Sequence, residues 1–120
     1  MNVILWGAQI LLAIIFTLVG VIKMTQPMDK LSVNMAWVSD FPVLFVRVLG
    51  LFELLLGLLI LLPRLVKPIP NLLAVYAGYV IVTIMIGAVI VHFKRGEHSF
   101  IVMNMIIIAM AVMIIATFKK

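Results

Sequence analysis

Apolar residues make up 67% of this chain of 120 residues, and charged residues make up 11%. An ordinary soluble domain has about 45–50% apolar and about 25% charged residues, and so short a chain could not bury this much apolar surface in a soluble core. The composition therefore excludes a soluble domain and predicts a protein that lies in the lipid bilayer. The net charge of +5 is spread over the connectors and the C-terminus, where such charges set topology and contact anionic lipids, so no nucleic acid is expected as a partner.

Four apolar stretches of about 20 residues predict transmembrane helices over residues 3–22, 43–62, 72–93 and 100–118. The first stretch is too long and too uniformly apolar for a signal peptide, and no cleavage site precedes Lys23. Three prolines follow the second stretch and are expected to end that helix at Pro63. Short connections between later spans require antiparallel neighbours, so we predict an all-α, up-down four-helix membrane bundle that forms a single domain over residues 1–120.

The longest connector, residues 23–42, has the sequence KMTQPMDKLSVNMAWVSDFP. Leu31, Met35 and Val38 recur in it at helical spacing, with Trp37 beside them. Two interpretations stay open for this segment. It forms a short amphipathic helix in the membrane interface, or it is a loop in which Trp37 serves as an interfacial anchor.

The positive-inside rule leaves the orientation of the bundle nearly undetermined. The face that carries both chain ends has four basic residues, Arg64, Lys67, Lys119 and Lys120, and the opposite face also has four, Lys23, Lys30, Lys94 and Arg95. The acidic residues of the connectors, Asp29, Asp40 and Glu97, tilt the balance toward cytoplasmic termini, although acids weigh little in this rule.

A few polar residues lie within the predicted spans, where ionisable groups are costly and each is a hypothesis for a functional site. The ionisable ones are Lys23, Arg47, Glu53 and His92, and the uncharged ones are Gln9 and Asn104. In the up-down topology Lys23, Arg47 and His92 share one level of the membrane. Glu53 lies six residues deeper than Arg47, about 9 Å at 1.5 Å per residue.

Helical spacing places these polar residues on inward-facing stripes. Gln9 and Lys23 belong to one seam of the first span, together with Ala13, Phe16 and Gly20. Glu53 lies between Gly50 and Gly57, which allow a neighbouring helix to approach closely. His92 follows Gly78 and Met85 at intervals of seven, and Asn104 precedes Ala111 at the same interval. We therefore predict an inward polar pocket, roofed by the long connector, in which Glu53 is paired with Arg47 or Lys23.

Each polar residue also has an ordinary structural explanation. Lys23 and Arg47 lie near helix ends, from which their long side chains can reach the membrane interface. His92 lies next to a basic turn and can be an interfacial residue. Gln9 and Asn104 fit hydrogen bonds between helices. Glu53 is the hardest to explain in this way, because it lies about ten residues from either end of its span.

The chain has no cysteine, which excludes disulfides, thiolate metal ligands and CxxC redox chemistry. The nine methionines fit adaptable packing, and we expect no metal site. Phosphate-binding loops, HExxH motifs and nucleophile elbows are missing, so no self-contained catalytic motif is evident. Any electron transfer would depend on a bound cofactor.

Four segments of the chain resemble the DoxX-like family of small bacterial membrane proteins. These are FTLVGVIKMTQP, WVSDFP, RVLGLFELLLGLLILLP and AVIVHFKRGE, and they cover nearly the whole chain in order. The resemblance implies a four-helix bundle in the bacterial cytoplasmic membrane, with Lys23, Arg47, Glu53 and His92 as its polar set. It also implies an association with quinone-coupled sulfur oxidation or oxidative-stress complexes. Other branches of the family often have an arginine early in the first span, where this chain has Trp6 and Gln9.

Three functions are consistent with these features. The first is a membrane subunit or ligand-binding component of a quinone-linked redox system, with a redox protein as partner and a quinone at Glu53 and His92. The second is a structural or regulatory membrane partner, alone or as a homo-oligomer, in which the ion pair only specifies the bundle. The third is a small proton-coupled transporter. Its carboxylate would have to release and rebind protons, whereas the nearby cations would hold Glu53 ionised, which argues against this function.

Overall fold

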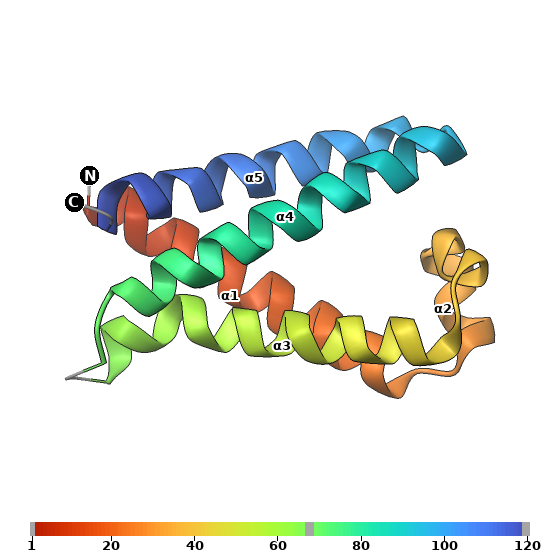
Figure 1. Ribbon diagram of the computed structural model, residues 1–120, viewed down its shortest axis with the longest axis horizontal. Helices are drawn as coiled ribbons and strands as arrows, with labels where there is room; N and C mark the ends of the chain where they lie inside the picture. Colours follow the sequence, from red (N-terminus) through yellow and green to blue (C-terminus); the bar gives the residue numbers. More distant parts are fainter. Residues whose placement is uncertain (1, 67–68, 119–120) are drawn as a thin grey trace.

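The computed structural model describes residues 2–66 and 69–118. These residues form the helices α1 (Asn2–Thr25), α2 (Met28–Asn34), the 3-10 helix η1 (Ala36–Asp40), α3 (Val43–Leu65), α4 (Leu72–Arg95) and α5 (His98–Phe118). Helices α1, α3, α4 and α5 are each long and apolar enough to cross a membrane, and they alternate in direction (Figure 1). The predicted all-α, up-down bundle is confirmed, and the chain is a multi-pass membrane protein with four candidate spans.

The long helices are arranged as two pairs. Helix α1 packs mainly against α3, and α4 packs mainly against α5. Figure 1 shows the pairs close together where α1 begins and α5 ends, and farther apart at the opposite end, which carries α2 and η1. We call the end where the pairs lie close together the closed end of the bundle, and the end that carries the connector the open end.

The apolar core runs through the centre of the bundle and takes side chains from all four long helices. Its largest fully buried members include Leu12, Phe16, Ile60, Ile81 and Ile114. Many other large apolar side chains face outward, among them Val3, Leu44 and Phe93. An outer surface this apolar fits contact with lipid rather than water.

The long connector is helical rather than a simple loop. It forms α2 and η1, which are separated at Met35. Leu31 and Val38 are fully buried and pack with Val46 at the start of α3 in a small second core. This packing holds the connector against the open end of the bundle. The helical character agrees with the amphipathic interpretation, although the segment forms two short helices, and its position in the membrane interface stays a prediction.

One predicted helix end is wrong. Helix α3 continues through Pro63 and ends at Leu65. Proline has no N–H, so within a helix it loses the hydrogen bond to the carbonyl four residues earlier, here that of Leu59, and its ring crowds that carbonyl. Near a helix end this loss is tolerated, and Pro63 is buried in the bundle. Lys67, Lys119 and Lys120 lie outside the described residues, so the orientation of the bundle stays a prediction.

Candidate functional site

The close approach of α1 and α3 begins at three glycines. A Cβ atom on Gly20 would lie 2.6 Å from the carbonyl oxygen of Gly50, and one on Gly57 would lie 2.6 Å from Oγ1 of Thr17. A Cβ on Gly50 would lie 2.8 Å from the Cβ of Lys23. No real side chain fits at such distances, so these glycines let the two backbones meet. As a result Lys23 lies directly beside the helix that carries Glu53.

Lys23 and Glu53 form a buried ion pair. Nζ of Lys23 donates a hydrogen bond of 2.8 Å to Oε1 of Glu53. Lys23 is 6% exposed and Glu53 is 4% exposed, so both charged groups are buried inside the protein. The ammonium also lies 4.9 Å from the centre of the Trp37 ring, within the range of a cation–π interaction. Trp37, which the loop interpretation treated as an interfacial anchor, therefore lies beside this pair.

Arg47 is not the partner of Glu53. Its Nη1 donates hydrogen bonds of 2.8 Å and 2.6 Å to the main-chain carbonyls of Lys23 and Gln26. The carbonyl of Lys23 would normally accept from the N–H of residue 27, but that residue is Pro27, which has none. Arg47 thus satisfies carbonyls at the C-terminal end of α1, where a cation is also favoured by the helix dipole.

His92 forms a second polar pair, with a residue that the sequence reasoning did not single out. Its Nδ1 lies 2.9 Å from Oε1 of Glu97. Gly96 has a φ of 73° and ends α4, while the N–H of Glu97 bonds to the carbonyl of His92 at 2.8 Å. This C-terminal turn folds Glu97 back over the last turn of the helix. A glycine four residues after a histidine, followed by a glutamate, is the signal that could have revealed this pair.

The His92–Glu97 pair continues outward to the connector. Arg95 contacts Glu97 at 3.4 Å and also pairs with Asp40 of η1. The exposed fractions of the side chains rise from 10% for His92 through 20% for Glu97 and 28% for Arg95 to 53% for Asp40. The pKa of the Glu97 carboxyl is lowered, mainly by its hydrogen bond with His92 and further by Arg95. A chain of ionisable groups thus leads from the bundle interior to the surface.

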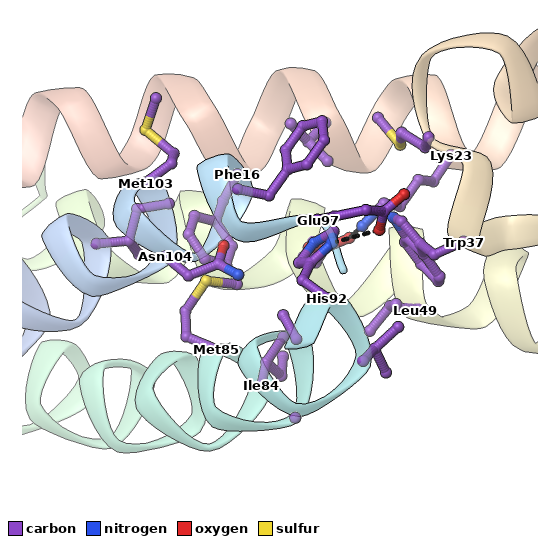
Figure 2. Close-up of a pocket in the computed structure, with 18 of the residues that line it drawn as sticks. Phe16, Lys23, Trp37, Leu49, Ile84, Met85, His92, Glu97, Met103 and Asn104 are labelled. Atoms are coloured by element: carbon purple, nitrogen blue, oxygen red, sulfur yellow. Dashed lines mark hydrogen bonds and ion pairs between the residues drawn. The ribbon is translucent and has the colours of Figure 1, made fainter. Parts of the chain in front are cut away.

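Both polar pairs line one cavity between the two helix pairs. Its volume is about 730 Å³, within the range of small-molecule sites. Figure 2 shows Lys23, Trp37, His92 and Glu97 on one side of it, and Asn104, Met85 and Met103 toward the other. The stripes predicted to face inward are buried, including Glu53, His92 and Asn104. The cavity combines a charged end near the connector with an apolar remainder.

Gln9 lies away from this cavity, toward the closed end of the bundle. Its Nε2 donates a hydrogen bond of 2.9 Å to the carbonyl of Ile60, and its Oε1 accepts one from Nε of Arg64. The guanidinium of Arg64 in turn lies 4.4 Å from the centre of the Trp6 ring. Gln9 therefore has the helix-joining role expected for it, linking α1 to the end of α3.

The fold and the cavity define a class of protein: a small multi-pass helical bundle with a mostly apolar cavity that has a charged end under a helical connector. Residues 7–114, most of the chain, match the DoxX-like family, and the chain belongs to that family. Comparisons with curated proteins and with solved structures give no match. Family membership therefore supports the membrane bundle and leaves its ligand to be argued from the cavity.

Proposed function

We propose that this protein is a ligand-binding membrane component of a quinone-linked redox system, and that the cavity receives the quinone. The observation that carries the proposal is the division of the cavity into a charged end and a larger apolar part. A quinone has the same division, with a polar ring and an apolar tail. When bound, it supplies two carbonyl oxygens that accept hydrogen bonds and take up protons on reduction.

The charged end offers suitable donors and a flat apolar surface. An ammonium group has three N–H donors, and Glu53 accepts from one of those of Lys23. The remaining donors of Lys23 can bind a carbonyl oxygen of the ring. Trp37 lies beside this ammonium and lines the same cavity, so its ring can stack on the quinone ring.

His92 and Glu97 are placed to move a proton between the cavity and the surface. The imidazole lines the cavity and stacks on Phe100 with ring centres 5.0 Å apart, which fixes its plane. Its Nδ1 is held by Glu97, which is itself more exposed. A histidine ring has two nitrogens, so it can take up a proton at one and release a proton at the other, and we assign the relay to His92 with Glu97 as its positioning partner.

A structural or regulatory role is the second candidate, and the geometry of Glu53 favours it specifically. The Glu53 carboxylate is already paired by Lys23 at 2.8 Å, so the pair could serve only to join α1 to α3. In that case the cavity would bind no quinone, and the ion pair would affect folding alone. Measuring whether the protein binds a quinone separates the two roles.

The cellular setting belongs to the same proposal. We place the protein in the bacterial cytoplasmic membrane with both termini on the cytoplasmic side, surrounded by lipid. A redox protein of that membrane is the partner that would supply or remove electrons. Assembly of the chain as a homo-oligomer is compatible with this arrangement.

The two tryptophans allow a direct test, because Trp37 lines the cavity and Trp6 packs on Arg64 at the other end of the bundle. Quinones quench tryptophan fluorescence on contact. In the Trp6→Phe variant, a short-tailed benzoquinone should quench Trp37 in a saturable manner, and Glu53→Gln should weaken that binding. In the matched Trp37→Phe variant, the quenching of Trp6 should be weak and linear. Equal, unsaturable quenching of both tryptophans would show partitioning into detergent and would refute the proposal.

A further inference from the structure

Asn104 has a buried amide nitrogen with no hydrogen-bond partner. Among the described residues its Nδ2 is the one buried side-chain nitrogen or oxygen left without a bond. The residue is 8% exposed and lines the cavity. Figure 2 shows its amide between Phe16 and Met85, on the side of the cavity away from Lys23. A buried amide without a partner destabilises the protein by about 1–3 kcal/mol, so it calls for an explanation.

The ordinary explanation, a hydrogen bond that joins helices, does not apply to this nitrogen. The sequence predicted hydrogen bonds between helices for both Gln9 and Asn104, and Gln9 makes one. Nδ2 of Asn104 reaches no acceptor on the described part of α1, α3 or α4. The neighbouring lining residues Phe16, Met85 and Ile107 belong to the apolar core. A water molecule needs two to four polar partners to be held in a buried position, and these side chains offer none.

We propose that Asn104 is a specificity-determining residue of the cavity, which donates a hydrogen bond from Nδ2 to an uncharged oxygen of the bound ligand. The inference rests on the proposed function and narrows it. One acceptor of the ligand meets the donors of Lys23, and a second acceptor, separated from the first, meets Asn104. The favoured class is therefore a molecule with two separated carbonyl oxygens on an apolar frame, rather than a lipid or fatty acid with a single polar head.

The charge distribution supports an uncharged acceptor at Asn104. Among the described residues that line the cavity, Lys23 is the one lysine or arginine, and it lies on the other side of the cavity from Asn104 (Figure 2). An anionic group beside Asn104 would be buried among Phe16, Met85 and Ile107 without a counter-charge, which is strongly unfavourable. A carbonyl oxygen carries no net charge, so it needs no counter-charge, and a hydrogen bond from the Asn104 amide satisfies it.

The test compares a ligand that has two oxygens on its ring with a ligand that has one. Calorimetric titration of the purified protein in detergent micelles would use a short-tailed benzoquinone and the phenol with the same ring substituents and tail. Asn104→Leu should weaken quinone binding about tenfold, the loss of one buried hydrogen bond. It should leave phenol binding within about twofold, because the single oxygen of the phenol is held by Lys23. Asn104→Gln, which keeps the amide, should recover part of the quinone affinity.

The controls separate this inference from the proposed function. Met105 lies on the outer surface of α5 and is exposed, so Met105→Leu should change neither affinity. The melting temperature of the ligand-free protein should not fall in Asn104→Leu, since the replaced nitrogen bonds to nothing inside the described protein. A fall in melting temperature, equal losses for both ligands, or unchanged quinone binding would overturn the role of Asn104. If the unmodified protein bound no quinone at all, the proposed function itself would be refuted.

Discussion

The Lys23–Glu53 pair allows the sharpest test of how the interior is built. Both residues are almost fully buried, with exposed fractions of 6% and 4%, and the charged atoms lie 2.8 Å apart. Removing one member leaves the other charge buried and unpaired, which costs about 3–5 kcal/mol. We therefore expect Lys23→Met and Glu53→Leu each to lower the free energy of unfolding by about that amount.

The double variant Lys23→Met/Glu53→Leu should behave very differently. It removes both charges and fills the space with apolar side chains of similar size. Replacing a buried ion pair in this way is commonly neutral or stabilising by about 1–4 kcal/mol. The double variant should therefore be more stable than either single variant, with a coupling energy of several kcal/mol, beyond the range of ordinary neighbouring residues.

The measurement is SDS-induced unfolding in mixed micelles, followed by tryptophan fluorescence for the four members of the cycle. A second cycle that combines Arg47→Met with Glu53→Leu is the control, because Arg47 binds main-chain carbonyls instead of Glu53. Its coupling energy should stay below about 1 kcal/mol. Additive effects in the Lys23 cycle, or a larger coupling in the Arg47 cycle, would show that Lys23 is not the partner of Glu53.

Three further predictions concern other parts of the bundle. Gly50→Ala should destabilise the protein by about 1–3 kcal/mol, because the added Cβ would lie 2.8 Å from the carbonyl oxygen of Gly20. Gly7→Ala is the control and should not destabilise the protein, because a Cβ at Gly7 meets nothing within 4 Å. Thermal unfolding of the two variants compares these effects. Arg95→Gln should leave the melting temperature nearly unchanged, since exposed ion pairs contribute little to stability. It should speed hydrogen exchange in α2 and η1, because the pair of Arg95 with Asp40 connects α4 to this connector. An unchanged exchange rate would contradict the prediction. The pKa of Glu97 is lower in the folded protein than its unfolded value near 4.5. The pair of Glu97 with His92 therefore stabilises the fold above about pH 4.5, and this stabilisation is lost as the pH falls through the folded pKa. Glu97→Gln should therefore reduce the loss of stability below about pH 4.5, and an unchanged acid profile would refute this.

The number of spans and the inward faces could be predicted from the sequence because both depend on local rules. Apolar length alone identifies helices such as α4 and α5, and helical spacing places Gln9, Glu53 and Asn104 inside regardless of the neighbouring helix. The same spacing placed Gly50 and Gly57 beside Glu53, at the helix contact that the structure shows. These predictions needed no knowledge of how the helices cross.

The partners of the polar groups could not be predicted, because they depend on tilt and on local backbone chemistry. Counting residues places Arg47 and Lys23 at one level and cannot decide which of them reaches Glu53. The deciding feature is Pro27, whose missing N–H leaves a carbonyl of α1 for Arg47 to bind. The pair of His92 with Glu97 likewise depends on the left-handed turn at Gly96.

Three features of this bundle oppose its stability, and they meet at one place. A buried ion pair is no more stable than apolar residues of the same volume, an amide nitrogen without a partner is destabilising, and an internal cavity loses packing contacts. Lys23, Glu53 and Asn104 all line the same cavity, while the closed end of the bundle is filled by apolar side chains and satisfied hydrogen bonds. Local conflicts with stability are expected at functional sites. Their gathering on the side where the helix pairs separate is the strongest physical support for the proposal that the cavity binds a ligand, because packing alone gives no reason for three destabilising features to lie together.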